Sequence, residues 1–333
     1  MSCTFTRSKE KDVSTKRLVQ LPNGEFVVAN ELGQRVYKTF MVVSASFRCD
    51  KGCPCCTAQI TTWPKGEDCW ERMDDCLARC EQAGITFEYV TMSGNGEPSM
   101  YPADVLRGLK ETFDRYDHLF EYRRFQTGGN ILWEPEVWNI FGPTYVFETT
   151  RMSLDDAEDM EILRYRRNYT ESPLFPRSRV VFNHTLLRRN EHRLLADIEG
   201  YVRRFSNVLA AVNLKILNPN TFDPNDLSSR QSQWILKHGL GKNDGQRIVE
   251  LMDAHFPRVN DYNPFYDRYE WLHPSGIKIT LYARLASYGL PNIVFYQGKL
   301  VDYGLKPQRL ELPEGTDILA LWRAAGEQSH VRA

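Results

Sequence analysis

Three cysteines with short spacing are the residues of this sequence best suited to hold an inorganic centre. Cys49, Cys53 and Cys56 form a C-x3-C-x2-C pattern in a turn-rich loop that also contains Gly52 and Pro54. Proteins bind iron-sulfur clusters through cysteine sulfurs at such separations. A four-iron cubane held by three thiolates leaves one iron without a protein ligand, and that iron can bind oxygen and nitrogen donors of a small molecule. The spacing therefore predicts one [4Fe-4S] cluster with an open iron.

The pattern resembles the signature of the radical S-adenosylmethionine (radical SAM) superfamily, where it lies on the loop after the first barrel strand. The resemblance implies a single-cluster enzyme whose cluster chelates S-adenosyl-L-methionine. It also implies that an electron, delivered by a donor such as flavodoxin or ferredoxin, cleaves the S–C5′ bond. The 5′-deoxyadenosyl radical would then take a hydrogen atom from the substrate, while the protein positions the cofactor and excludes water.

One residue of the loop departs from the family pattern. The residue before the third cysteine is usually aromatic in the superfamily, and here it is Cys55. We expect Cys55 to lie beside the adenine without binding the cluster. The alternative is a structural zinc site with Cys55 or Cys69 as fourth ligand, because zinc prefers four sulfur or nitrogen donors in a tetrahedron.

A second motif, Thr91–Pro98, follows the expected second strand and resembles the superfamily's Gly-Gly-Glu-Pro segment. In the family, the backbone and the acid of this segment bind the amino group of S-adenosylmethionine. Glycine lets the backbone approach a ligand closely, and a carboxylate pairs with an ammonium group. Because Asn95 replaces the usual first glycine, its expected contact is through the backbone. The cofactor-binding residues expected here are Ser93, Gly94, Asn95, Gly96 and Glu97.

Polar residues at the ends of the third and fourth strands extend the expected cofactor site. The resemblance assigns Thr127 to the ribose and adenine, and Glu148, Arg151 and Ser153 to the ribose and the carboxylate. Another interpretation is that Ser153 caps the following helix, and the two roles are compatible.

Asn183, Asn213 and Lys215 are polar residues among the apolar ones of the fifth and sixth strands. Where one face of a strand points into a barrel, a buried lysine needs an anionic partner. These three residues are therefore candidates for substrate binding, with Lys215 pairing with a carboxylate or phosphate. The alternative is that Lys215 reaches solvent at the strand end.

The elements that must position these residues alternate between strand and helix. Strands are expected at 39–46, 86–93, 122–127, 144–150, 179–186 and 208–217, with helices at 69–80, 102–116, 134–140, 154–167 and 191–205. Six parallel strands with crossover helices predict an α/β fold, an open or closed barrel rather than a sandwich. The resemblance to the radical SAM superfamily implies a partial (β/α)6 TIM-like barrel. Ligand sites of such barrels lie at the C-terminal rim of the strands, where both motifs fall.

The two ends of the chain differ from this repeat. Asn23-Gly24 between two β-like runs predicts an N-terminal hairpin. After 218–220 we expect a polar segment, a helix at 242–256, a strand at 277–283, a hairpin around 297–298 and a last helix at 316–325. The expected domains are an N-terminal extension (1–39), a radical SAM core (40–220) and a C-terminal α+β extension covering the barrel and the substrate site (221–333).

Composition limits the partners and the location. The chain of 333 residues is 42% hydrophobic, and it contains no long apolar segment and no secretory signal, so we expect a cytoplasmic protein with no membrane partner. A formal charge of -1 argues against a large nucleic-acid footprint. All eight cysteines lie at or before Cys80, so the residues after it cannot form the cysteine-rich domain in which peptide-modifying members often hold extra clusters.

These observations favour a small polar metabolite as substrate, such as a sugar, nucleoside or amino-acid derivative in specialised biosynthesis. The reaction after hydrogen abstraction is open between decarboxylation, dehydration, epimerisation and carbon-carbon coupling. Modification of a peptide or tRNA is the alternative enzymatic function. A zinc-stabilised binding protein is the alternative outside enzymes.

Overall fold

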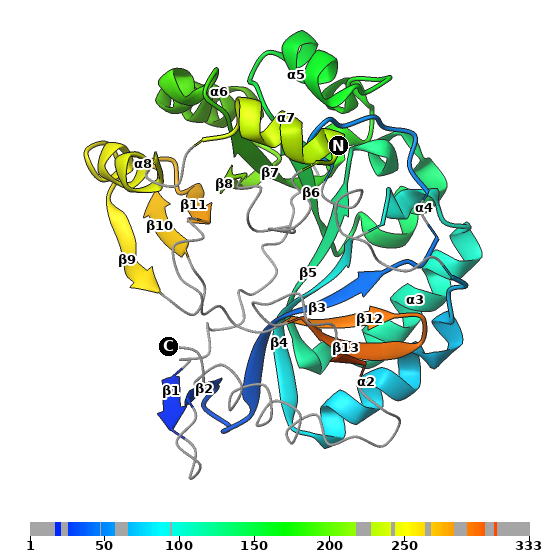
Figure 1. Ribbon diagram of the computed structural model, residues 1–333. Helices are drawn as coiled ribbons and strands as arrows, with labels where there is room; N and C mark the ends of the chain where they lie inside the picture. The colour runs from blue at the N-terminus through cyan, green and yellow to red at the C-terminus, as the bar shows by residue number, and fades with distance from the viewer. Residues whose placement is uncertain are drawn as a thin grey trace, which may run out of the picture.

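Six parallel strands form the centre of one curved sheet in the computed structural model (Figure 1). Side by side and in sequence order they are β3 (Arg35–Val43), β4 (Ile85–Ser93), β5 (Phe120–Thr127), β6 (Val146–Arg151), β7 (Arg179–Leu186) and β8 (Leu209–Ile216). The structure describes residues 17–20, 26–46, 48–56, 66–93, 95–217, 228–240, 244–263, 268–282, 292–303 and 310–311. The expected α/β class and partial (β/α)6 barrel are confirmed.

Helices between these strands lie along the outer side of the sheet (Figure 1). They are α2 (Met73–Gln82), α3 (Ala103–Arg115), α4 (Pro135–Phe141), α5 (Asp156–Leu163) and α6 (Leu194–Phe205). Short 3-10 helices accompany them: η1 (Trp70–Arg72), η2 (Pro98–Met100), η3 (Asp117–Leu119), η4 (Asn130–Trp133), η5 (Tyr169–Glu171), η6 (Phe175–Arg177) and η7 (Glu191–Arg193). No helix among the described residues is long and apolar enough to cross a bilayer.

The C-terminal part of the chain extends the sheet at both edges. Beside β3 lie β12 (Asn292–Tyr296), which is parallel to it, then β13 (Lys299–Tyr303) and β14 (Leu310–Glu311). Beside β8 lie β11 (Lys278–Tyr282), also parallel, then β10 (Arg268–Leu272) and β9 (Arg258–Asn263). Two further helices are α7 (Arg230–His238) and α8 (Asp244–Asp253). The expected extension thus continues the sheet of the expected core, and the division into domains stays a prediction.

The expected hairpins are present. At the N-terminus β1 (Arg17–Gln20) pairs antiparallel with β2 (Phe26–Ala29), and β2 joins the sheet through a pair between Ala29 and Arg35. The second hairpin is β12–β13, with Gln297 and Gly298 between its strands. Both central residues have positive φ angles, 51° and 72°, which the turn between two twisted strands requires.

Aromatic side chains fix the central strands against the helices. The rings of Phe87 and Phe120 on neighbouring strands have centroids 5.7 Å apart, and Phe113 of α3 meets Phe120 edge-on at 6.2 Å. Full burial of each such side chain contributes about 1.5–3 kcal/mol. On α2 the residues at helical spacing pack inward, and these are Met73, Cys76, Leu77 and Cys80.

Some element boundaries differ from the expected ones. The first barrel strand begins at Arg35, inside the segment assigned to the N-terminal extension. Helix α5 ends at Leu163 rather than near 167, because Arg164 adopts a left-handed conformation with φ of 56°. Helix α7 begins at Arg230, where a polar loop was expected, and Ser229 caps it. The strands β9 and β10 were not expected, and the helix at 316–325 lies outside the described residues.

Candidate functional site

The two sequence motifs meet at the C-terminal ends of neighbouring strands. Arg48, in the cysteine loop after β3, forms a parallel bridge with Gly96, and the amide of Glu97 donates to the Arg48 carbonyl at 2.6 Å. Gly96 has a φ of 124°, and a Cβ there would lie 2.2 Å from the Arg48 carbonyl oxygen. Only glycine allows this approach. Gly94, also expected here, lies outside the described residues.

The three motif cysteines are each partly exposed, whereas Cys55 is buried. Burial raises the pKa of the Cys53 thiol to about 12, and the charges of Cys56 and Cys49 add to this rise. Burial also raises the pKa of Cys49, where Glu97 and Cys56 act in the same sense. The three thiols are therefore close enough to oppose one another's ionisation. A cationic centre bound between them would relieve that repulsion.

The thiols do not surround a single point. Within the described part of the chain, no three His, Cys, Asp or Glu side chains are placed to hold one metal ion. A [4Fe-4S] cluster is compatible with this arrangement, because each thiolate would bind a different iron. A zinc ion would instead need four donors around itself. Metal analysis decides between the two centres.

Lys51 anchors the cysteine loop to the end of β5 and was not singled out from the sequence. Its side chain is 8% exposed, lies 3.5 Å from Asp50, and donates a hydrogen bond to Asn130. The Lys51 ammonium also lies 4.6 Å from the ring centroid of Tyr165. Its positive charge partly offsets the rise, caused mainly by burial, in the pKa of Cys53. The sequence offered one indication of a role for Lys51, which is its position between Cys49 and Cys53.

Glu97 links the second motif to β5. This residue is 2% exposed, and its carboxylate accepts hydrogen bonds from the Ser99 amide (3.3 Å) and hydroxyl (2.6 Å). It also accepts from the Thr127 hydroxyl (2.7 Å) and the Gly128 amide (2.5 Å). A carboxylate has about four acceptor positions. The structure therefore brings Glu97 and Thr127 together, and a ligand ammonium would join or displace one of these donors.

Ser93 and Glu148 belong to one polar network on the central strands. The Ser93 hydroxyl donates to Gln126, whose amide donates to Glu148 at 3.2 Å, and Arg124 donates to Glu148 at 2.5 Å. Burial alone would raise the pKa of Glu148. Arg124 and Lys215 outweigh burial and hold this pKa below its usual range. Ser93, Glu148 and Lys215 are thus brought together from three strands.

Asn183 and Asn213 lie opposite each other on β7 and β8. Each is 5% exposed, and the Asn213 amide donates to the Asn183 side-chain oxygen at 3.0 Å. The next alternating pair in the same register is Thr185 with Lys215. Asn213 therefore lies two residues before Lys215 on the same face of the sheet. Contact of the two asparagines with a substrate stays a prediction.

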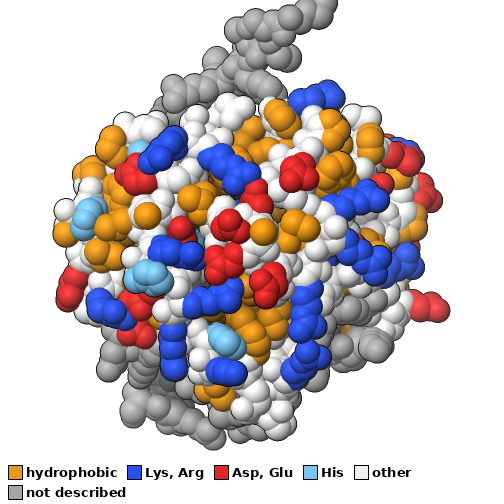
Figure 2. All heavy atoms as spheres, turned by 90° about the horizontal axis from the view of Figure 1, so that it is seen from above, with side chains coloured by type: hydrophobic (Ala, Val, Ile, Leu, Met, Phe, Trp, Pro, Cys, Tyr) orange, Lys and Arg blue, Asp and Glu red, His pale blue; other side chains and the backbone are white. Residues whose placement is uncertain are grey.

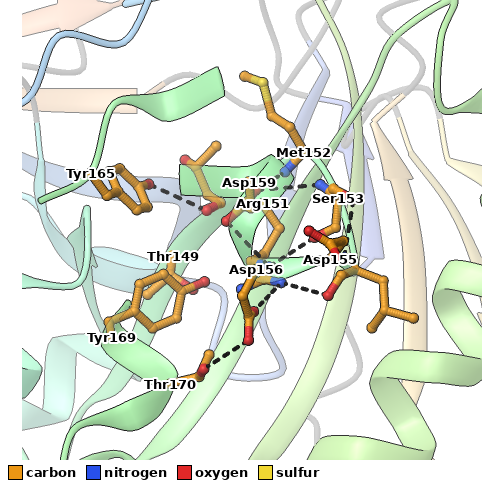
Figure 3. Close-up of polar contacts among 12 residues, drawn as sticks. Thr149, Arg151, Met152, Ser153, Asp155, Asp156, Asp159, Tyr165, Tyr169 and Thr170 are labelled. Atoms are coloured by element: carbon orange, nitrogen blue, oxygen red, sulfur yellow. Dashed lines mark hydrogen bonds and ion pairs between the residues drawn. The ribbon is translucent and has the colours of Figure 1, made fainter. Parts of the chain in front are cut away.

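Arg151 lies in a buried ionic cluster behind the end of β6 (Figure 3). Its side chain has 0% exposure, donates to Asp156 at 2.8 Å, and lies 3.4 Å from Asp159. The Asp159 carboxylate accepts from the Met152 amide at 2.6 Å. These contacts give Arg151 a structural role in the turn from β6 to α5. Its assignment to S-adenosylmethionine stays a prediction.

Ser153 belongs to the same turn but does not cap α5. The N-cap is Asp155, whose carboxylate accepts from the Glu158 amide at 2.7 Å. The Ser153 hydroxyl instead donates to the Glu158 carboxylate at 2.5 Å and accepts from the Asp155 amide at 3.1 Å. The capping interpretation of Ser153 is therefore wrong, because the N-cap lies two residues later, at Asp155.

No protein-family model and no curated protein matches the sequence. Among solved structures, SuiB of Streptococcus suis aligns with a TM-score of 0.50 when bound to the precursor peptide SuiA and 0.51 when bound to S-adenosylmethionine. A third structure of SuiB gives 0.52. Sequence identity is 12% to 13% in these alignments, which cover 87% of this chain. They cover 65% to 66% of SuiB, so the chain spans just under two thirds of that protein's length.

At this identity the likeness concerns the fold. It extends beyond the six-stranded core, since 87% of the chain aligns and the added edge strands lie within the same sheet. The cysteine spacing and the Ser93–Glu97 segment predicted the same architecture independently of any structure. The chain has the fold of SuiB, and the resemblance of its two motifs to the radical SAM superfamily predicted an α/β barrel of this kind.

Proposed function

We propose that this protein is a radical SAM enzyme that abstracts a hydrogen atom from a small polar metabolite. The observation that carries the proposal is the junction of the cysteine loop with Gly96 and Glu97 at the ends of β3 and β4. This junction puts three thiols beside a backbone segment suited to an amino-acid ligand, on the rim where α/β barrels bind ligands.

In this proposal Cys49, Cys53 and Cys56 hold a [4Fe-4S] cluster, and the Asn95–Glu97 backbone holds the amino-acid part of S-adenosylmethionine. The bound pair would supply one-electron chemistry that generates the 5′-deoxyadenosyl radical. Glu97 keeps the ends of β4 and β5 together through Thr127 and Gly128. Lys51 holds the cysteine loop against Asn130. A protein electron donor such as flavodoxin or ferredoxin in the cytoplasm would deliver the electron.

A small metabolite is favoured as substrate by the polar side chains on the barrel strands, which include Asn183, Asn213 and Lys215. On the face of the molecule shown in Figure 2, basic and acidic side chains are intermixed. This mixture is unlike the continuous basic surface that nucleic acids attract.

Peptide modification is a second candidate, because SuiB, which has the same fold, was solved with a precursor peptide. Capture of a peptide by the full chain, followed by deuterium transfer from labelled peptide into 5′-deoxyadenosine, would favour this candidate. Transfer from a labelled metabolite with no peptide present would favour the first.

The proposed cluster is tested by anaerobic reconstitution with iron and sulfide. The protein is expected to be brown, to contain about four irons per chain, and to bind S-adenosylmethionine only when the cluster is present. A colourless protein with stoichiometric zinc would show that the zinc-stabilised alternative is correct.

A further inference from the structure

Lys38 contacts residues from the opposite side of the curved sheet. Its ammonium lies 4.8 Å from the ring centroid of Tyr282 on β11, although the five strands β4 to β8 separate β3 from β11 in the sheet. Arg268 of β10 likewise lies 3.8 Å from Glu88 of β4. Such contacts can form only across the concave interior, so these side chains point into the barrel.

Cationic side chains from four strands gather there. Lys38 is influenced electrostatically by Arg268, Lys215 and Arg124, as well as by the carboxylate of Glu88. Burial, followed by the charge of Arg268, lowers the pKa of Lys38 to about 8. The surroundings therefore disfavour the charged form of Lys38, and an anion placed among these cations would stabilise it.

The acids of this region are more deeply buried than the cations. Glu148, Glu88 and Glu270 have side-chain exposures of 3%, 7% and 6%, against 22% for Arg124 and 20% for Arg268. Lys38 and Lys215 are also partly exposed. The carboxylates are thus more deeply buried than the four cationic side chains, each of which keeps some exposure.

Among the described residues of this cluster, the cationic side chains outnumber the carboxylates. Glu148 pairs with Arg124 at 2.5 Å, and Glu270 lies 3.1 Å from Arg268. Glu270 also lies 3.6 Å from Lys278, so its charge is shared. Two lysines and two arginines therefore face three carboxylates, one of which has an additional cationic neighbour. A site of this kind favours a compact anion with several acceptor oxygens.

The cluster is continuous with the proposed cofactor site. Arg124 stacks its guanidinium over the Tyr89 ring at 4.3 Å and binds Glu148, which connects through Gln126 to Ser93. Ser93 begins the segment that ends at Glu97. An anionic group held at Lys38 would thus belong to a molecule lying in the barrel below the cofactor motifs.

We propose that Lys38, together with Arg124, Lys215 and Arg268, binds an anionic group of the substrate, either a carboxylate or a phosphate. That the bound anion is part of a substrate rests on the proposed function, but the anion site itself does not require the cluster. Lys38 is a binding and positioning residue that fixes the substrate by its charged end.

The test is competitive labelling of lysines in the full-length protein with a trace of an amine-acylating reagent, followed by peptide mapping. Acylation requires the neutral amine, so a bound anion slows it by shielding Lys38 and by keeping it protonated. Inorganic phosphate and acetate are the two probes, each against chloride at equal ionic strength. Lys237, an exposed residue of α7, is the internal control.

At saturation, at least one probe is expected to slow labelling of Lys38 by about tenfold, equivalent to about 1.4 kcal/mol, with Lys237 unchanged. Protection by phosphate alone indicates a phosphorylated substrate, and protection by acetate indicates a carboxylate. Lys215→Met should remove most of the protection while leaving the circular dichroism spectrum intact. Equal labelling of Lys38 with and without both probes, or equal protection of Lys237, would overturn the proposal.

The labelling is done on protein with and without cluster, which separates this inference from the proposed function. Protection of Lys38 in a protein that cannot cleave S-adenosylmethionine would leave the anion site standing and reject the radical chemistry. Cleavage of S-adenosylmethionine without protection of Lys38 would support the radical chemistry and reject the anion site.

Discussion

The backbone amide of Glu97 donates a 2.6 Å hydrogen bond to the carbonyl of Arg48, one residue before the first motif cysteine. The bond joins two loops that are about fifty residues apart in sequence but follow neighbouring parallel strands. It places the cysteine loop against a backbone segment that glycine keeps open. The cofactor site therefore depends on the close approach of two backbones as well as on the thiols.

Gly96→Ala is expected to prevent this approach and to lower cluster content. The added Cβ would lie 2.2 Å from the Arg48 carbonyl oxygen, and the φ of 124° is strained for alanine. Gly84→Ala is the matched control, since Gly84 has a φ of 64° with no atom within 4 Å of the new Cβ. The control should lose about 1–2 kcal/mol of stability and retain iron. Equal iron content in the two variants, measured after reconstitution, would contradict the role of the junction.

Cys53→Ala and Cys55→Ala should have opposite effects on bound iron. Cys53 belongs to the partly exposed trio whose thiols influence one another, whereas Cys55 is buried in the apolar core. We expect Cys53→Ala to lose the visible absorption and most of the iron, and Cys55→Ala to keep both. Loss of iron in Cys55→Ala at unchanged thermal stability would show that the fourth thiol is a ligand.

Arg151→Met is expected to destabilise the fold by about 3–5 kcal/mol, because it leaves buried carboxylates without their cation. Arg204→Met is the control: Arg204 pairs with the same Asp156 but is 46% exposed, and an exposed pair contributes about 0–1 kcal/mol. Urea unfolding measures both changes. An Arg151→Met protein that is as stable as Arg204→Met but no longer binds S-adenosylmethionine would instead support the ligand role.

His184 should make the protein less stable as the pH falls below 6.5. Burial lowers the pKa of His184 from 6.5 to about 3, with further lowering by Arg151 and Arg193, while Asp197 lies 3.9 Å away. Below pH 6.5 the unfolded chain binds a proton that the folded chain does not, so stability present above pH 6.5 is lost as the pH falls towards 3. The loss between pH 7 and pH 5 should be about 2 kcal/mol.

His184→Gln isolates this effect, because glutamine keeps a polar group facing the Tyr201 hydroxyl, which lies 2.9 Å from the histidine Nδ1. The variant should lose that part of the dependence on pH, whatever its absolute stability. If the free energy of unfolding changed with pH equally in the two proteins over this range, His184 would not be buried in its neutral form.

The sequence predicted the barrel because its signals were local. Apolar runs ended close to the observed strand ends, as at Ser93, Thr127 and Leu186, and the cysteine spacing lies within one loop. The hairpin around Gln297-Gly298 was also predicted from its turn residues. Each of these depends on residues near one another in the chain, where propensity and periodicity act.

Contacts between distant segments could not be predicted in this way. Lys38 was assigned to an N-terminal extension, and nothing near it in sequence indicates that it faces Tyr282 across the barrel. Arg151 has the residue type of a ligand contact, yet Asp156 and Asp159 on the following helix bind its guanidinium. A side chain's partners depend on how strands curve and helices pack, which single-sequence patterns do not contain.

The proposed radical chemistry is tested by the amount of 5′-deoxyadenosine released when anaerobically reconstituted protein is mixed with S-adenosylmethionine and dithionite. We expect the wild-type protein to release 5′-deoxyadenosine and methionine in equal amounts, and Cys53→Ala to release neither. No 5′-deoxyadenosine from a protein with a full complement of iron and sulfide, or the same release from Cys53→Ala, would contradict the proposed chemistry.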